Sequence, residues 1–168
     1  MLHTLLSYFD KRNLISTASA HCDIPCKIYD PSSAQIASLT IIRMMDLIQE
    51  LSEKETLSLT EQAQFSRLLA EKELHATKVK DEIRVIWGDY FKQPQFDQFP
   101  DTHKLAHKIM LQASKCKQTL ARDASTELLV LVNEFASTFW KTKSVETFTA
   151  TCPYPPAEQV VYPKLAES

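Results

Sequence analysis

The residues that could do chemistry gather in one short stretch near the start of the chain. His21 and Cys22 are adjacent, Cys26 follows after three residues, and Pro25 stands between the two thiols. Thiolates and imidazole are ligands for late first-row metals such as copper, nickel or zinc. Pro25 fixes its own φ angle and has no N–H group, so it favours a turn that brings Cys26 back towards Cys22. The stretch is therefore a candidate metal-binding loop.

Other interpretations of this loop compete with a redox metal centre. A Cys-x-x-x-Cys pair with one histidine could be an incomplete zinc site, although a zinc site normally has four ligands. The remaining cysteines, Cys116 and Cys152, lie far along the chain, and the thiols could also be unrelated to one another. A thioredoxin-type motif needs two residues between its cysteines, whereas this loop has three. The ligand set alone leaves these alternatives open.

The whole stretch 21–31 resembles the metal hook of the nickel-containing superoxide dismutases. That family carries the pattern H-C-x-x-P-C-x-x-Y-D-P, and all of its fixed positions are present: His21, Cys22, Pro25, Cys26, Tyr29, Asp30 and Pro31. The resemblance implies that the chain is cut just before His21. It also implies that one nickel ion per subunit is held by the α-amine and imidazole of His21, the amide nitrogen and thiolate of Cys22, and the thiolate of Cys26.

The implied ligands account for the spacing of the residues. The α-amine, the next amide nitrogen and the thiolate of Cys22 close two adjacent five-membered chelate rings, and nickel(II) favours the square-planar arrangement that they begin. Thiolates and a deprotonated amide donate electron density, which makes nickel(III) accessible. A metal that cycles between two oxidation states can take an electron from one superoxide anion and give it to the next. The implied function is an oxidoreductase, a superoxide dismutase that produces oxygen and hydrogen peroxide.

The resemblance extends to residues around the hook. Tyr29 matches the hook tyrosine, and we expect it to admit only small molecules to the metal. Asp23 is expected to stabilise the folded-back loop through backbone N–H groups rather than to bind metal. Farther along, the stretch 87–92 resembles the W-x-D-Y-F-K segment of the family. Its tyrosine, Tyr90, matches one that lies near the metal hook.

Three features depart from the family pattern. The position after the second cysteine is usually glycine in the family and is Lys27 here, so we expect a different local backbone, because only glycine takes φ > 0 at no cost. We also expect the charge of Lys27 to attract superoxide. The acidic residue and arginine that hold the hook histidine align by spacing with Ala37 and His75, which makes axial binding by His21 less secure. The stretch 144–168 has no counterpart.

The first twenty residues are interpreted as a leader that is removed. The segment 18–20 looks like a signal-peptidase site, but charges at 10–12 interrupt the apolar run that a secretory signal requires. A propeptide explains the segment better, because His21 has no free α-amine while it remains acylated. The expected partners therefore include a leader-processing protease. The expected compartment is a reducing one, since four cysteines in such a chain do not form a disulfide scaffold, and the resemblance implies the cytoplasm.

Composition predicts one all-α domain. The chain has 168 residues, 44% of them hydrophobic, and only one glycine, Gly88, whereas sheets and tight hairpins use glycine in their turns. A formal net charge of -2 with no dominant basic face argues against nucleic acid as the main partner. No apolar run approaches the roughly 18 residues that a membrane span needs.

Helical spacing of apolar residues predicts four amphipathic helices, at about 32–51, 58–87, 102–122 and 123–143. Ser32 or Ser33 is expected to cap the first, and Ser58 with Glu61 resembles a capping box for the second. The apolar positions predicted for the first helix are Ile36, Leu39, Thr40, Met44, Leu47, Ile48 and Leu51. Leu105, Ile109 and Leu120 are expected to face inward from the third helix, and Leu128, Leu131, Val132, Phe135 and Phe139 form a stripe on the fourth.

The predicted architecture is an antiparallel four-helix bundle with an N-terminal metal hook and a C-terminal Pro-rich tail. Its segments are a leader at 1–20, the hook and bundle at 21–143 and an extension at 144–168, whose four prolines exclude a long helix. The resemblance implies a homohexamer. Two other functions remain open: a non-catalytic helical metal-binding or storage protein that uses the same hook, and a helical interaction protein with an incidental Cys/His loop.

Overall fold

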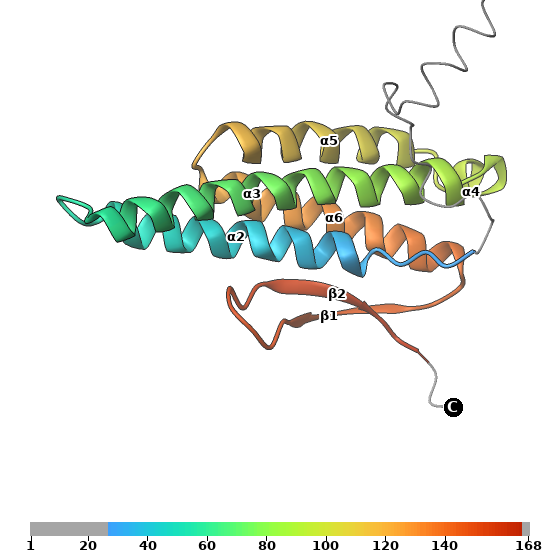
Figure 1. Ribbon diagram of the computed structural model, residues 1–168. Coiled ribbons are helices and arrows are strands. Elements are labelled where there is room, and N and C mark those ends of the chain that lie inside the picture. The colour runs from blue at the N-terminus through green and yellow to red at the C-terminus, as the bar shows by residue number, and fades with distance from the viewer. Residues whose placement is uncertain (1–26, 166–168) are drawn as a thin grey trace, which may run out of the picture.

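A computed structural model describes residues 27–165, and this part of the chain is mainly helical, as predicted (Figure 1). The predicted leader and metal hook, including His21, Cys22, Asp23 and Cys26, lie outside the described residues. In chain order the elements are α2 (Ser32–Ser52), α3 (Leu59–Val85), the π-helix η1 (Ile86–Tyr90), α4 (Gln93–Gln98), α5 (Thr102–Gln118), α6 (Arg122–Thr142), β1 (Thr147–Thr151) and β2 (Gln159–Pro163).

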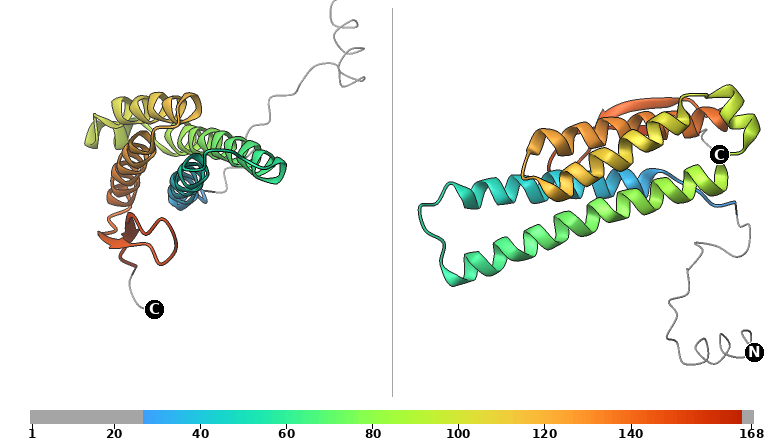
Figure 2. Two further views of the ribbon diagram at one scale, coloured as in Figure 1. Left: turned by 90° about the vertical axis from the view of Figure 1, so that its left-hand side faces the viewer. Right: turned by 90° about the horizontal axis from the view of Figure 1, so that it is seen from above.

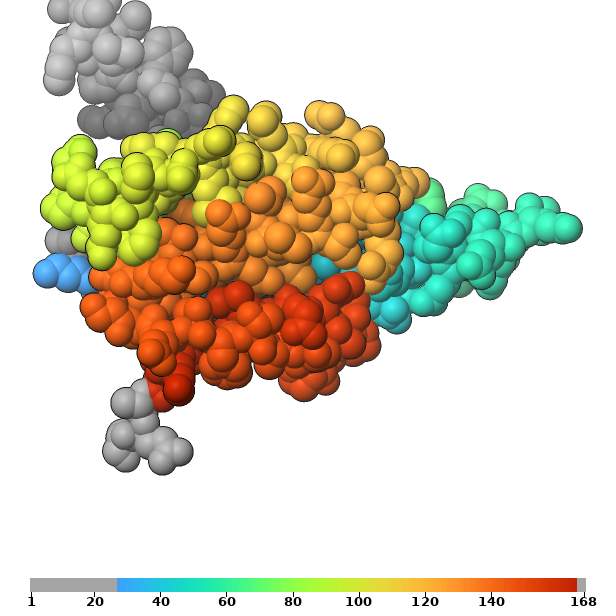
Figure 3. Space-filling model, turned by 180° about the vertical axis from the view of Figure 1, so that it is seen from behind, coloured from blue at the N-terminus to red at the C-terminus, as the bar shows by residue number. Residues whose placement is uncertain are grey.

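The four long helices α2, α3, α5 and α6 share one hydrophobic core. α2 and α5 each lie against both α3 and α6, an arrangement visible along the helix axes (Figure 2). Ile41 of α2, Ile83 of α3, Ile109 of α5 and Phe135 of α6 are fully buried in the same cluster. The joint between α2 and α3 projects beyond the rest of the molecule, where Ile48 and Leu68 form part of a smaller cluster (Figure 3). Burial against several neighbours therefore fixes the paths of all four helices.

The two predicted helix starts have different outcomes. The capping box of α3 is confirmed, because the Glu61 carboxylate accepts from the Ser58 backbone N–H at 2.8 Å and the Glu61 N–H donates to the Ser58 hydroxyl at 3.4 Å. The predicted serine cap of α2 is wrong. Asp30, two residues before the helix, accepts from the Ser32 N–H at 2.8 Å. Its carboxylate thus occupies the position that stabilises the first turn of α2.

The buried face of α2 is broader than the predicted stripe. Leu39, Ile48 and Leu51 are buried as predicted, but Ile36 is 55% exposed, and Ile41 and Ile42 are completely buried instead. Thr40, Met44 and Leu47 are only partly buried. The reason is that α2 is covered on two sides: Ile41 packs into the main core, while Leu39 and Ile42 pack under the C-terminal strands. A single apolar stripe cannot describe a helix with two buried faces.

The third and fourth helices separate earlier than predicted. α5 ends at Gln118, and Thr119 is extended, with φ -128° and ψ 165°. Leu105 and Ile109 are buried as predicted, but Leu120 is 51% exposed because it lies in the connection between the helices. All five predicted stripe residues of α6 are buried or half-buried. The sequence therefore located the two helices correctly and misplaced the break between them.

The C-terminal extension is not a Pro-rich tail but a β-hairpin, so the all-α prediction is wrong for this segment. β1 and β2 are antiparallel, with Thr149 opposite Val161. The hairpin lies along α2 and α6 (Figure 1), and Cys152 and Val160 are buried against residues of these helices. The low glycine content did not exclude a hairpin, because Ala157 takes a left-handed backbone, with φ 58°, in the connection between β1 and β2.

None of the helices within residues 27–165 is both long and apolar enough to cross a membrane.

Candidate metal centre

The described chain begins one residue after the second predicted thiol ligand, so the structure shows the base of the hook rather than the hook itself. We call residues 27–31 the hook base. It leads directly into α2, whose first turn is closed by the N–H groups of Ala34 and Gln35, both of which donate to Pro31 O at 3.1 Å. His21, Cys22, Asp23 and Cys26 lie outside the described residues. The position of α2 therefore decides where the hook leaves the protein.

Lys27 occupies the left-handed backbone region, with φ 60°. Glycine enters this region freely, whereas an L residue is disfavoured there by roughly 1–2 kcal/mol. The expectation that lysine would exclude a glycine-like backbone is therefore not confirmed. Lys27 keeps that backbone and adds a positive charge at the point where the hook begins.

Tyr29 and Tyr90 meet at the hook base. Their ring centroids are 5.7 Å apart, with planes tilted by 53°. The Tyr90 hydroxyl lies 2.5 Å from the Thr142 hydroxyl, and its ring packs on Phe139 with centroids 4.8 Å apart. Thr142 and Phe139 both belong to the C-terminal end of α6. Two tyrosines separated by sixty residues of sequence thus come together at the hook base, whereas the predicted metal ligands lie outside the described residues.

The turn that presents Tyr90 is a π-helix, which sequence periodicity did not predict. η1 continues α3 with one extra residue in the turn, and the Phe91 N–H donates to Ile86 O at 3.2 Å. Turns of this kind are rare in proteins, and many of those that occur lie at functional sites. Phe91, which follows directly, is buried against Phe96 and Phe135. This anchor holds the last turn of η1 and hence Tyr90.

Lys143 is a second positive charge at the same place, and sequence reasoning did not single it out. Its Nζ lies 4.8 Å from the centroid of the Tyr90 ring and 5.1 Å from that of Phe139. A cation over an aromatic face is favourable, as is a cation at the C-terminal end of a helix such as α6. The face of Tyr90 is therefore held under a fixed positive charge.

The side chains that could bind a metal fall into two groups, those within residues 27–165 and those that precede the hook base. Within residues 27–165 there is no cluster of three or more His, Cys, Asp or Glu residues that could hold a metal ion. Cys116 and Cys152 are both buried, and burial raises the pKa of the Cys116 thiol, which makes it a poor source of thiolate. The sequence places His21, Cys22 and Cys26 immediately before the hook base, and this N/S donor set fits nickel.

Comparison with known proteins decides the family. The model of nickel-containing superoxide dismutases matches residues 16–143, which include the whole hook and all four long helices. The chain belongs to the nickel-containing superoxide dismutase family. Nickel is the cofactor that this membership implies.

Individual members of the family support the assignment. The chain is 30% identical to the nickel superoxide dismutase of Streptomyces coelicolor over 128 residues, which cover 76% of this chain and 91% of that protein. It is 30% identical to that of Streptomyces seoulensis over 126 residues, or 74% and 89% of the two chains. A native nickel superoxide dismutase structure matches with a TM-score of 0.64 and 28% identity, covering 73% of this chain and 99% of that chain.

His75 is one departure from the nickel superoxide dismutase pattern that the structure describes. Its Nδ1 lies 2.9 Å from Glu71 O and 3.5 Å from the Glu71 carboxylate, so this nitrogen is engaged by its own helix. When Nδ1 donates to that carbonyl, Nε2 of the neutral ring is an acceptor. Ala37 shares a hydrophobic cluster with Ala76, the neighbour of His75 in the chain. The residues at these two positions therefore provide no ion pair for the hook histidine.

Proposed function

We propose that this chain is a nickel superoxide dismutase whose metal centre forms at a processed N-terminus beginning at His21. The observation that supports it best is the complete hook pattern, together with the contact between its Tyr29 and Tyr90 at the hook base. His21, Cys22 and Cys26 would hold the metal, and Asp23 would stabilise the loop between them. Bound nickel would supply a centre that changes oxidation state by one electron, as the conversion of superoxide to oxygen and hydrogen peroxide requires.

The residues of the hook base would control access to that centre. The two tyrosine rings would narrow the approach so that only small molecules enter, and Thr142 holds the Tyr90 hydroxyl in one orientation. Lys27 and Lys143 would raise the local concentration of the superoxide anion, because a positive field attracts anions and accelerates their association. This chain would thus provide a selective, electrostatically favourable entrance to the metal.

The proposal also covers processing and assembly. A protease would remove residues 1–20, which frees the α-amine of His21 for the metal. The four long helices would serve as the antiparallel bundle of the family, in a homo-oligomer, by resemblance a hexamer, within the cytoplasm. A non-catalytic metal-binding or storage protein is the alternative, because Ala37 and His75 cannot provide the ion-paired support for a ligand histidine.

The decisive experiment measures processing, metal and activity on the same sample. In protein from the native host we expect an intact mass that begins at His21, nickel near one ion per chain, and superoxide consumption that disappears on chelation and returns with nickel but not with zinc. An active chain that retains its first twenty residues would contradict the proposal. Stoichiometric nickel without superoxide consumption would favour the storage protein.

Reversal of the charge at Lys27 provides a test of the entrance. We expect Lys27→Glu to slow superoxide consumption about 10-fold at low ionic strength and much less at 0.15 M salt, because screening suppresses interactions beyond about 8 Å. Lys27→Gly is the matched control, since it removes the charge and retains the left-handed backbone; its rate should fall between the other two. Rates that are equal for all three chains at every salt concentration would exclude steering by Lys27.

A further inference from the structure

The hairpin at 147–163 packs on the two helices whose ends adjoin the hook base. α2 begins immediately after the hook base, and α6 ends at Thr142, which holds Tyr90. The family match ends at residue 143, so the hairpin lies beyond the segment that this chain shares with its relatives. Its apolar side buries Val160 and Cys152 against Leu39 and Ile42 of α2 and against α6. The hairpin therefore connects two helices whose ends meet beside the hook base.

Two side-chain amides attach β2 to these helices, and we call them the amide anchor. Asn133 of α6 accepts through Oδ1 from the Val161 N–H at 3.1 Å and donates through Nδ2 to Gln159 O at 2.9 Å. Gln35 of α2 donates through Nε2 to Val161 O at 2.8 Å and to Asn133 Oδ1 at 2.9 Å. The amides thus pair with the backbone groups along one edge of β2, as a third strand would.

The amide anchor joins directly to the hook base. Gln35 is only 5% exposed, and both N–H groups of its amide are used in the two bonds described above. Its own backbone N–H closes the first turn of α2 by donating to Pro31 O at 3.1 Å. A displacement of β2 or Asn133 would leave the buried Gln35 amide without partners, which is unfavourable. The register of β2 is therefore coupled to the first turn of α2.

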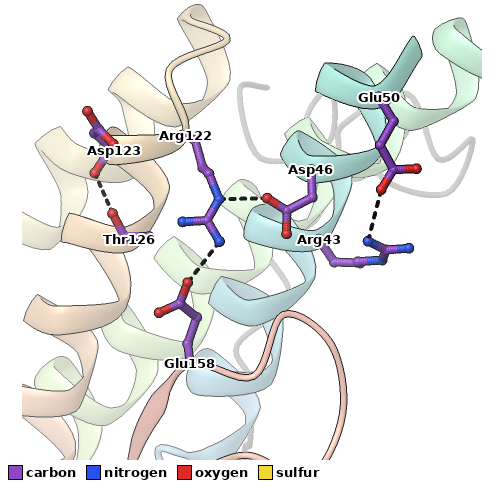
Figure 4. Close-up of polar contacts among 7 residues, drawn as sticks. All are labelled: Arg43, Asp46, Glu50, Arg122, Asp123, Thr126 and Glu158. Atoms are coloured by element: carbon purple, nitrogen blue, oxygen red, sulfur yellow. Dashed lines mark hydrogen bonds and ion pairs between the residues drawn. The ribbon is translucent and has the colours of Figure 1, made fainter. Parts of the chain in front are cut away.

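A separate ionic anchor holds the loop that connects β1 to β2. Arg122, at the start of α6, donates to Asp46 of α2 at 2.6 Å and to Glu158, next to β2, at 2.9 Å (Figure 4). Arg122 is partly exposed and lies where α6 begins, far along that helix from Thr142. The two anchors can therefore be tested independently.

We propose that the C-terminal hairpin is a positioning element for the metal centre, which acts through the Gln35–Asn133 amide anchor on the first turn of α2. It braces α2 against α6 and so keeps Tyr29 in contact with Tyr90 and the hook in one direction. This inference rests on the proposed function for its metal, but the positioning itself is a property of the folded chain.

Asn133→Leu tests the proposal in the processed chain, which begins at His21 and keeps the whole C-terminal hairpin. Hydrogen exchange is measured before nickel is added. Leucine matches the size of asparagine but cannot hold β2 or Gln35. We expect amide exchange in 28–36 to rise about 10-fold, as local openings become easier, and the dissociation constant for nickel(II) to rise about 10-fold, the range seen when support for a metal ligand is lost. Arg122→Gln is the control: exchange should rise at 152–158 and change less than about 2-fold at 28–36.

A second variant keeps the test decisive if Asn133→Leu folds poorly. Asn133→Asp retains the acceptor for Gln35 and Val161 and loses only the donor to Gln159 O, so it should lie nearer the wild type in both measurements. Unchanged exchange at 28–36 in Asn133→Leu, with increased exchange in the hairpin, would overturn the proposal. If the wild-type chain binds no nickel, the proposed function fails, and the exchange measurement still decides whether the hairpin positions the hook base.

Discussion

Serine in place of Cys22 or Cys26 is expected to lower superoxide consumption by at least about 100-fold, the upper end of what the loss of mere support for a ligand costs. A hydroxyl is a harder and far weaker donor than a thiolate, so each change removes one corner of the proposed nickel site and the electron density that makes its higher oxidation state accessible. The measurement is the rate of superoxide disappearance per chain, together with nickel content after dialysis.

The chain contains its own controls for this prediction. Cys116 and Cys152 are buried away from the hook base, and each donates through Sγ to a backbone carbonyl, that of Ala124 at 3.2 Å and that of Tyr154 at 3.3 Å respectively. A serine hydroxyl can make the same bonds, so Cys116→Ser and Cys152→Ser should keep their activity and nickel. The helical spectrum of all four variants should match the wild type. Full activity in Cys22→Ser or Cys26→Ser would eliminate the proposed ligand set.

The chemistry of this protein could be read from its sequence because the donors are neighbours in the chain. A proposed chelate built from consecutive residues needs no tertiary structure to bring it together, and the same is true of the capping box at Ser58 and Glu61. A helix whose predicted apolar stripe is buried was also located correctly, as in α6. The resemblance alone indicated that Tyr90 lies near the hook, and neither periodicity nor spacing would have provided its contact with Tyr29.

Several features that sequence reasoning missed depend on contacts between distant residues. The hairpin is attached through Gln35 and Asn133, which are 126 and 28 residues before Val161. α2 has two buried faces because this hairpin covers one of them. Lys143 lies beside the hook base only because η1 brings Tyr90 to the end of α6. Local sequence patterns indicate which segments form helices. They do not indicate which distant residue will hydrogen-bond to an amide or a carbonyl, or pack on an aromatic ring.

A buried lysine illustrates the same limit and leads to the second prediction. Lys72 lies in the middle of α3 and is 1% exposed. Its Nζ donates to three carbonyl oxygens at the end of α5: Cys116 O at 2.8 Å, Lys117 O at 2.9 Å and Thr119 O at 3.0 Å. The last four carbonyls of a helix have no partner within it, and an ammonium group has three N–H donors to offer. Lys72 therefore terminates α5 and fixes the break that the sequence did not predict.

Lys72→Met is expected to lower the free energy of unfolding by about 3 kcal/mol, because it leaves several carbonyl groups without partners in the interior. For a chain of this size the corresponding fall in Tm is roughly 6–12 °C. Thermal unfolding followed by circular dichroism measures it. Lys80→Met is the control: Lys80 also lies on α3, but it makes one bond, to the Ser114 hydroxyl, and its loss should cost less than about half as much. Equal melting temperatures for both variants would refute the capping role.

The pH dependence of the same pair of chains tests whether folding buries the Lys72 amine. Burial lowers the pKa of Lys72 below its usual value of 10.5, so the unfolded chain binds more protons than the folded chain between the lowered pKa and 10.5. The stability of the wild type should consequently rise with pH across that interval, relative to Lys72→Met, in which the titrating group is absent. The difference in unfolding free energy between the two chains, measured with urea at several pH values, should therefore grow as the pH approaches 10.5. A constant difference would mean that the Lys72 amine titrates alike in the folded and unfolded chains.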